Sequence, residues 1–437
     1  MRLLRATLPA LAFAAAPLRA QTPDTARVVT AVRFGRLADG TGAVTRDAVV
    51  VVEGEKIARV GTGDTAVPAG AKVIDLRRYT GIPGLIDVHT HMTFWWDRNA
   101  GTRPWAQLGS LGAPATVFLA QENARHTLET GVTTVRDLGS WEYTDLAMRA
   151  LINRGAMVGP RMFVAGCGLQ ITSSPWRPGP PQNGCGQADG VAEVERAARQ
   201  QIGAGVDWIK MYGSTGSDQD VSGFETFSYE EMKAAADIAH RAGKRIAIHS
   251  YGPDGARDAV RAGAESVEHA TDMDDATIAE MARRGTYYVP TVDHNRYYAA
   301  HAAEYGYGPE VVARLNDYTA RNLETLRRAV RARVKIAMGS DAVFTGFGEN
   351  TRELEQFVKA GMTPAQALFA ATRGGAELLG MPKQLGAVAP GYYADMVAVE
   401  GDPLADVEAV VHGVRWVMKG GRVVVDSTAA PARASSR

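Results

Sequence analysis

The feature that most constrains the fold is a regular alternation of apolar and helical segments across residues 82–380. Segments 227–243 and 274–285 have helical character, and the second ends at Gly285 as a C-terminal cap. This alternation predicts parallel strands separated by helices, in a (β/α)₈ TIM barrel or in a doubly wound open sheet. The apolar runs cover residues 85–91, 133–139, 161–166, 207–213, 245–252, 265–271, 286–291 and 334–342.

Both ends of the chain have a different texture. Short β-rich runs broken by Gly and Asp fill residues 28–73, and the same pattern returns at 394–425. Because two similar ends flank a different middle, we predict a small β-sandwich domain built from residues 21–81 and 381–437. The barrel is then the catalytic domain, at 82–380.

The first twenty residues have the pattern of an export signal. Arg2 and Arg5 precede an apolar stretch at 8–17 that is too short to span a bilayer, and Ala20 offers a cleavage point. We therefore expect residues 1–20 to be a signal peptide and the protein to be periplasmic or secreted.

Charge and hydropathy narrow the classes of molecule that the protein is expected to bind. The 48 basic and 48 acidic residues give zero formal net charge, which favours neither a nucleic-acid partner nor an anionic membrane surface. No later run is long and apolar enough for a membrane span. We expect a small neutral or zwitterionic substrate, and a homo-oligomer.

Metal-ligand residue types stand at the C-terminal ends of five predicted strands. In a barrel, the catalytic groups converge at this end of the strands, so the placement favours the barrel over the open sheet. A lone histidine at a strand end is usually structural, but a repeated pattern is harder to explain that way. The residues are His89, His91, Lys210, His249, His269 and Asp341.

The first strand carries two of these residues. Side chains alternate between the faces of a strand, so His89 and His91 point the same way. A His-x-His pair can therefore present two imidazoles to one ion.

These motifs resemble the amidohydrolase superfamily of metal-dependent hydrolases, over essentially the whole mature chain. The subgroup that it resembles most contains imidazolonepropionase-like and Xaa-Pro dipeptidase-like enzymes. The similar segments are GLIDVHTH (84–91), GVTTVRDLG (131–139), IKMYGSTG (209–216), AIHSYG (247–252), SVEHAT (266–271), GSDA (339–342) and LGAVAPGYYADMVAVEGDPLADV (385–407).

The resemblance implies two divalent metal ions, zinc in our expectation, and a Lys210 carboxylated by CO₂ that bridges them. It assigns His89 and His91 to one ion, and His249 and His269 to the other. An unmodified ammonium has no lone pair for a metal, so Lys210 can act as a ligand only when neutral or carboxylated. By the same resemblance, Asp341 contacts the first ion and the hydrolytic water, as general base and then acid.

The sequence defines the residues that contact the substrate less well than it defines the metal ligands. The resemblance places Tyr251 at a substrate carboxylate, and Tyr212 belongs to one of the similar segments. His294 and Arg296 follow the seventh strand, where Arg296 could meet a carboxylate or pair on the surface. Tryptophans follow the first strand as a candidate aromatic wall, with ordinary packing as the alternative; they are Trp95, Trp96 and Trp105.

The segment at 166–190 departs from the dipeptidase-like pattern. Those enzymes usually carry a histidine there that helps to hold the substrate, and this segment has none. It contains the two cysteines of the chain, Cys167 and Cys185, for which we expect a disulfide in an exported protein. Two unpaired buried thiols are the alternative.

The sequence thus predicts an exported two-metal amidohydrolase that opens a C–N bond in an amide or peptide. Our specific expectation is a dipeptide or an N-acyl amino acid, attacked by a metal-bridging hydroxide. A lactonase or phosphotriesterase would use the same residues. A catalytically silent metal-binding scaffold would be expected to lack one or more ligands, and all six are present.

Overall fold

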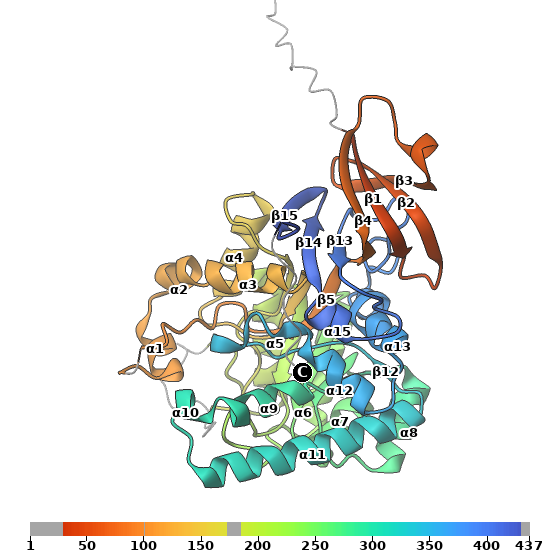
Figure 1. Ribbon diagram of the computed structural model, residues 1–437. Helices are drawn as coiled ribbons and strands as arrows, with labels where there is room; N and C mark the ends of the chain where they lie inside the picture. Colours follow the sequence, from red (N-terminus) through yellow and green to blue (C-terminus); the bar gives the residue numbers. More distant parts are fainter. Residues whose placement is uncertain (1–28, 100, 173–184, 430–437) are drawn as a thin grey trace, which may run out of the picture.

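The computed structural model describes residues 29–99, 101–172 and 185–429 (Figure 1). The predicted signal peptide at 1–20 lies outside these residues. The described chain forms an α/β part with parallel strands and a mixed sheet beside it. The boundaries predicted for the two domains stay a prediction.

Each of the eight predicted apolar runs overlaps one strand, and paired strands among them are parallel. Strands β5, β6 and β10 are buried along their whole length, which explains why their runs are continuously apolar. The strands are β5 (Leu85–Thr90), β6 (Val132–Asp137), β7 (Arg161–Val164), β8 (Trp208–Tyr212), β9 (Arg245–Ser250), β10 (Ser266–His269), β11 (Tyr287–Val289) and β12 (Lys335–Ile336).

The eight strands form two sheets, β5-β6-β7 and β12-β11-β10-β9-β8. Single bridges join them at both junctions: Leu169 pairs with Met211 of β8, and Ala342 pairs with Thr90 of β5. The described strands therefore follow one another in chain order around a ring, but they do not make one continuously closed sheet.

Helices follow the strands, and local signals set their ends. Helix α6 (Tyr229–Arg241) starts with a capping box in which Ser228 and Glu231 bond each other's backbone N–H groups. Helix α8 (Asp275–Arg284) ends at Gly285, whose φ of 75° suits glycine, as predicted. The other helices are α1 (Pro104–Ser110), α2 (Ala113–Leu119), α3 (Gln121–Glu129), α4 (Thr144–Asn153), α5 (Val191–Ala204), α7 (Pro253–Ala262), α9 (Val292–Ala300), α10 (Ala302–Tyr305), α11 (Pro309–Arg331), α12 (Glu353–Lys359), α13 (Pro364–Phe369), α14 (Gly375–Leu378) and α15 (Glu408–Val411).

The two β-rich ends of the chain meet in one seven-stranded sheet, ordered β15-β14-β13-β4-β1-β2-β3. The prediction that both ends build one unit agrees with this pairing, but the two-sheet β-sandwich is not confirmed, because the strands form a single sheet. Its strands are β1 (Val29–Ala38), β2 (Val44–Glu53), β3 (Lys56–Thr62), β4 (Lys72–Pro83), β13 (Met396–Val399), β14 (Val414–Lys419) and β15 (Arg422–Asp426).

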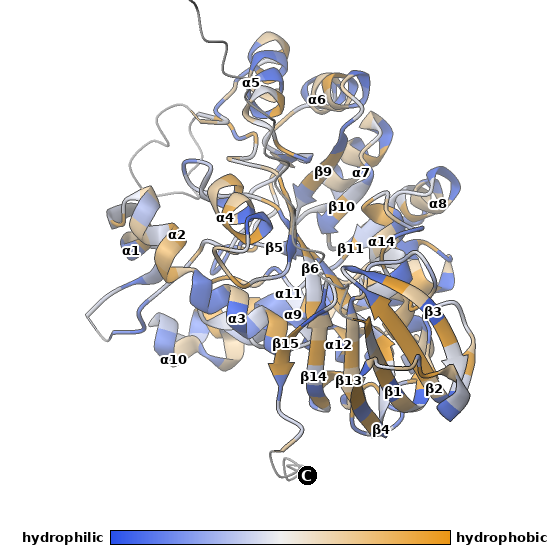
Figure 2. Ribbon diagram, turned by 90° about the horizontal axis from the view of Figure 1, so that it is seen from above, coloured by the Kyte–Doolittle hydropathy of each residue, from blue (hydrophilic) through white to orange (hydrophobic). Residues whose placement is uncertain are grey.

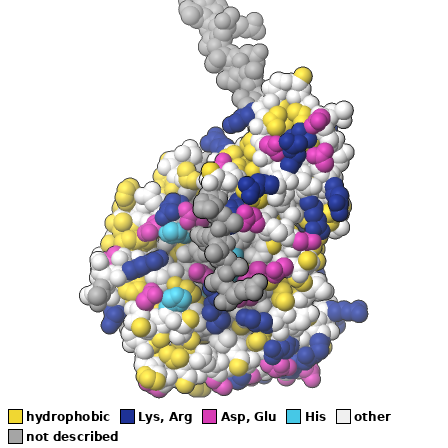
Figure 3. Space-filling view, in the orientation of Figure 1, with side chains coloured by type: hydrophobic (Ala, Val, Ile, Leu, Met, Phe, Trp, Pro, Cys, Tyr) yellow, Lys and Arg dark blue, Asp and Glu magenta, His cyan; other side chains and the backbone are white. Residues whose placement is uncertain are grey.

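This sheet buries apolar residues on both faces, and Figure 2 shows its strands as mainly hydrophobic. Val397 and Val417 belong to the core shared with the parallel strands, while Phe34 and Trp416 belong to a separate core. No helix in the described residues is long and apolar enough to cross a membrane. On the face in Figure 3, basic and acidic side chains are interspersed.

Candidate metal centre

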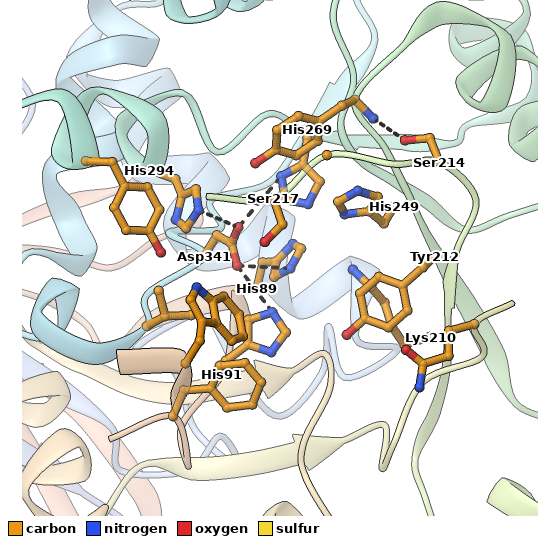
Figure 4. Close-up of a pocket in the computed structure, with 17 residues that line it drawn as sticks. His89, His91, Lys210, Tyr212, Ser214, Ser217, His249, His269, His294 and Asp341 are labelled. Atoms are coloured by element: carbon orange, nitrogen blue, oxygen red, sulfur yellow. Dashed lines mark hydrogen bonds and ion pairs between the residues drawn. The ribbon is translucent and has the colours of Figure 1, made fainter. Parts of the chain in front are cut away.

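A pocket opens where the C-terminal ends of the parallel strands meet, and it gathers all six residues predicted as metal ligands (Figure 4). Three further residues predicted as substrate contacts, Tyr212, Tyr251 and His294, also line it. The remaining lining residues are Phe94, Trp105, Gln170, Ser214, Gly216, Ser217, Tyr298 and Val343.

Asp341 stands among four imidazoles in this pocket (Figure 4). Its Oδ1 lies 3.3 Å from Nε2 of His91 and 3.5 Å from Nε2 of His89. Its Oδ2 lies 3.3 Å from Nε2 of His294 and 3.9 Å from Nδ1 of His269. One carboxylate therefore reaches side chains from β5, β10 and α9.

Hydrogen bonds at Nδ1 orient two of these histidines, His91 and His269. Nδ1 of His91 is 2.8 Å from the carbonyl oxygen of Gly139, and Nδ1 of His269 is 2.7 Å from Oγ1 of Thr291. A hydrogen bond at Nδ1 fixes the ring and leaves Nε2 available, which is the usual arrangement of metal-bound histidines.

Two imidazole nitrogens in the pocket are suited to bind a metal ion. Nε2 of His89 and Nε2 of His249 are buried and have no hydrogen-bond partner within residues 29–99, 101–172 and 185–429. Such an orphaned buried nitrogen is costly unless an ion occupies its lone pair. Ligand atoms of His89, His269 and Asp341 also lie within 4.8 Å of one another. The donor set thus fits a divalent metal ion, with nitrogen and carboxylate ligands of the type that zinc accepts.

Burial favours the neutral form of three imidazoles, those of His89, His249 and His269, and the neutral form is the one that binds metal. Burial is the largest cause that lowers the pKa of His89, to about 4. Burial lowers the pKa of His249 and His269 well below the usual range.

Lys210 comes from the middle of β8 and is almost fully buried, with 1% of its surface exposed. Its Nζ lies 5.1 Å from the ring centre of Tyr212. Lys210 lines the same pocket as His89 and His249.

Asp87 does not face the metal ligands but holds their strand. Its carboxylate accepts bonds from the backbone N–H of Ser340 (2.9 Å), from Oγ of Ser340 (2.5 Å) and from Nδ2 of Asn350 (3.0 Å). These contacts tie β5 to the segment that carries Asp341, so Asp87 orients the strand end that carries His89.

Several residues around the pocket hold a left-handed backbone that side chains other than glycine seldom adopt. The φ angle is 73° at His269, 48° at Thr291, 53° at Asp341 and 51° at Phe344. Such strain persists only where the surroundings enforce it, and it concentrates at functional sites.

Three candidate residues do not line the pocket. Arg296 does not line the pocket; it forms an ion pair with Asp293 of its own helix, one turn away. Trp95 donates to Glu122 at 2.9 Å, and Trp96 donates to Thr102 at 2.8 Å, so of the three tryptophans only Trp105 faces the pocket.

The pocket also contains residues that sequence reasoning missed. Gln170, Ser214 and Ser217 each follow the C-terminal end of a strand, which is the signal that could have found them. Gln170 lies in the segment bracketed by Cys167 and Cys185, which form a disulfide as predicted. Residues 173–184 of that segment lie outside the described residues.

Comparisons with known proteins indicate the family of the chain. The profile of the Amidohydrolase family matches residues 80–424. Ochratoxinase of Aspergillus niger is 31% identical, over 93% of this chain and 88% of its own. Imidazolonepropionase of Anaeromyxobacter sp. (strain K) is 27% identical, over 86% and 90%. A solved Xaa-Pro dipeptidase with bound methionine in its active site superimposes with a TM-score of 0.81 and 31% identity, over 90% of this chain and 99% of that one.

Proposed function

This chain belongs to the amidohydrolase family, and we propose that it is a two-metal hydrolase that cleaves an amide or peptide bond in a small molecule. It is an enzyme that acts on carbon–nitrogen bonds. The observation that carries the proposal is the contact of one buried carboxylate, Asp341, with His89, His91, His269 and His294. This cluster of one carboxylate and four imidazoles is not explained by stability of the fold alone. Buried polar groups that lack full hydrogen-bond partners lower the free energy of unfolding.

We propose that the eight parallel strands work as one (β/α)₈ barrel. The junctions at Leu169–Met211 and Thr90–Ala342 support this, since each carries a parallel bridge. A barrel explains why side chains from β5, β8, β9 and β10 meet at one end.

His89, His91 and Asp341 would hold one ion, and His249 and His269 the other, with carboxylated Lys210 shared between them. Bound divalent ions lower the pKa of water and polarise a carbonyl or phosphoryl oxygen. Zinc is the ion that we propose, because imidazole and carboxylate suit it.

Asp341 is placed to hold and move the proton of the reaction. Its two oxygens face different histidines, so one can stay anchored while the other accepts a proton and later returns it to the leaving nitrogen. His294 lies at the same carboxylate and within the pocket, where it can steady that proton or contact the substrate.

We propose a dipeptide or an N-acyl amino acid as substrate. The likeness to an Xaa-Pro dipeptidase and to ochratoxinase supports this class. We also propose export to a periplasm or the exterior, and assembly as a homo-oligomer. The disulfide between Cys167 and Cys185 supports export, because disulfides persist in oxidising compartments.

The test is a hydrolysis assay of the zinc-loaded protein with dipeptides, N-acyl amino acids, a lactone and a phosphotriester. We expect amide cleavage, and a loss of roughly 100-fold or more in kcat for Asp341→Asn. Asp402→Asn is the matched control, because Asp402 pairs with Arg36 on the surface of the mixed sheet. Faster turnover of the lactone or phosphotriester than of any amide would contradict the proposed reaction.

A further inference from the structure

One side of the pocket is an aromatic wall, formed by Phe94 after β5 and Trp105 on α1. Their ring centres are 5.7 Å apart in an edge-to-face arrangement. Phe344, after β12, packs behind both rings, at 5.9 Å from Phe94 and 5.1 Å from Trp105. These are favourable geometries for aromatic pairs, and they present an apolar surface to whatever enters the pocket.

The aromatic wall adjoins the candidate metal centre. The ring of Phe94 stacks on the imidazole of His91, with 4.8 Å between the ring centres and 26° between the planes. A substrate group that lies on the wall is therefore next to the bond that the centre would cleave.

Trp105, which lines the pocket, is held in place by a residue from a different loop. Its indole N–H donates to Oδ2 of Asp218 at 2.8 Å, and Asp218 lies in the loop after β8, far from α1 in sequence. The side chain of Asp218 is buried, with 8% of the residue exposed, and its backbone is left-handed at a φ of 59°. A half-buried tryptophan on a seven-residue helix would otherwise have several rotamers.

The rest of the wall is equally constrained. The backbone N–H of Phe344 donates to the carbonyl oxygen of Phe94 at 3.0 Å, although Phe344 has a left-handed φ of 51°. A bulky residue persists in that conformation only when its surroundings enforce it. The structure thus holds strain where it positions these rings.

We infer that Phe94 and Trp105 select an aromatic substituent beside the cleaved bond, and that Asp218 is the positioning residue that holds Trp105 against it. This inference rests on the proposed amide hydrolysis and adds a substrate class: amides and dipeptides with a phenyl-sized or indole-sized side chain. An aromatic group gains edge-to-face or stacked contact with the wall, which an aliphatic side chain of similar volume lacks.

The experiment compares kcat/KM for dipeptides that differ only by Phe or Leu, at the first or the second position. For the wild-type enzyme we expect a preference for Phe of roughly tenfold at one position. Trp105→Ala is expected to reduce this ratio to about one. Trp95→Ala is the matched control, because Trp95 belongs to the same segment and its indole N–H bonds Glu122 outside the pocket.

The role of Asp218 is tested by two variants. Asp218→Asn keeps an oxygen that can accept the indole N–H and is expected to keep the Phe/Leu ratio, whereas Asp218→Leu removes the acceptor and is expected to lower it. A residue with a merely structural role would change thermal stability in both variants without changing the ratio. If Asp218→Leu does not fold, the smaller Asp218→Ala, which also removes the acceptor of the indole N–H, takes its place and is expected to lower the ratio as well.

Two outcomes would overturn the inference: a wild-type ratio near one at both positions, or a ratio unchanged by Trp105→Ala. In either case cleavage of the dipeptides would leave the proposed function standing. Absence of any dipeptide or N-acyl amino acid cleavage by the zinc-loaded enzyme would instead contradict the proposed function, and the inference with it.

Discussion

Nδ1 of His89 lies 2.8 Å from Oε2 of Glu268, and both side chains are fully buried. The other oxygen of Glu268 accepts from Nη2 of Arg136 at 2.9 Å. Burial alone would raise the pKa of Glu268, but Arg136 and the bond to His89 outweigh it and hold the pKa at about 2. Glu268 is therefore a carboxylate that orients His89 and is itself oriented by Arg136.

Glu268→Gln is expected to weaken metal binding by roughly 10- to 100-fold, because it removes the charge that raises the basicity of His89. The measurement is competition for zinc against a chromophoric chelator. Glu265→Gln is the control, since Glu265 precedes the same strand but pairs with His240 at the surface. Equal affinity in Glu268→Gln and the wild type would contradict the orienting role.

His294→Asn is expected to lower kcat by roughly 100-fold without changing the metal content, because His294 contacts Asp341 but is not one of the proposed ligands. Steady-state kinetics and metal analysis on the same sample make the measurement. His301→Asn, at the end of the same helix, is the control, as its ring stacks on Tyr297 outside the pocket. Loss of an ion from His294→Asn would show instead that His294 is a ligand.

Removal of the disulfide by Cys167→Ser with Cys185→Ser is expected to lower the free energy of unfolding by about 3 kcal/mol, for a sequence separation of 18 residues. Reduction of the wild-type protein should shift its urea midpoint in the same direction. The double variant should not respond to the reductant. A wild-type midpoint that the reductant leaves unchanged, with both thiols shown to be free, would contradict a stabilising bridge.

Burial raises the pKa of Asp218 to about 6. The folded protein then holds this proton more tightly than the unfolded chain does, so the contribution to stability is complete below about pH 4 and is lost as the pH rises through 6. The side chain in Asp218→Asn cannot ionise, so this variant does not lose that contribution to stability as the pH rises. We expect the unfolding free energy of Asp218→Asn minus that of the wild type to increase by roughly 3 kcal/mol from pH 4 to pH 7.5 in urea titrations. An unchanged difference would contradict an ionising buried carboxyl.

The parallel strands could be predicted because each signal is local. The apolar runs and the helix cap at Gly285 depend on neighbours in sequence, and the structure places a strand or a helix end at each. The single mixed sheet was not predicted as such. Its form depends on the pairing of β4 with β13, two strands more than 300 residues apart whose register has no local signature.

In the candidate site, too, some features have a local sequence signal and others depend on residues that are distant in sequence. Residues at strand ends, such as His249 and Asp341, could be identified as candidates because chain position decides where they point. The sequence left two roles open for Arg296, and the structure shows the pairing one: Arg296 lies on α9 and forms an ion pair with Asp293 of the same helix. Trp105 could not be separated from Trp95 and Trp96 by sequence, since its partner, Asp218, comes from a distant loop.

The central claim is a two-metal centre that needs Lys210. The direct measurement is the zinc content per chain of the wild-type protein and of Lys210→Ala, each loaded with zinc in the presence of bicarbonate, by plasma mass spectrometry. We predict two ions per wild-type chain and one or fewer in the variant, with circular dichroism showing that its fold survives. One ion per wild-type chain under these conditions, or two ions in Lys210→Ala, would contradict the account.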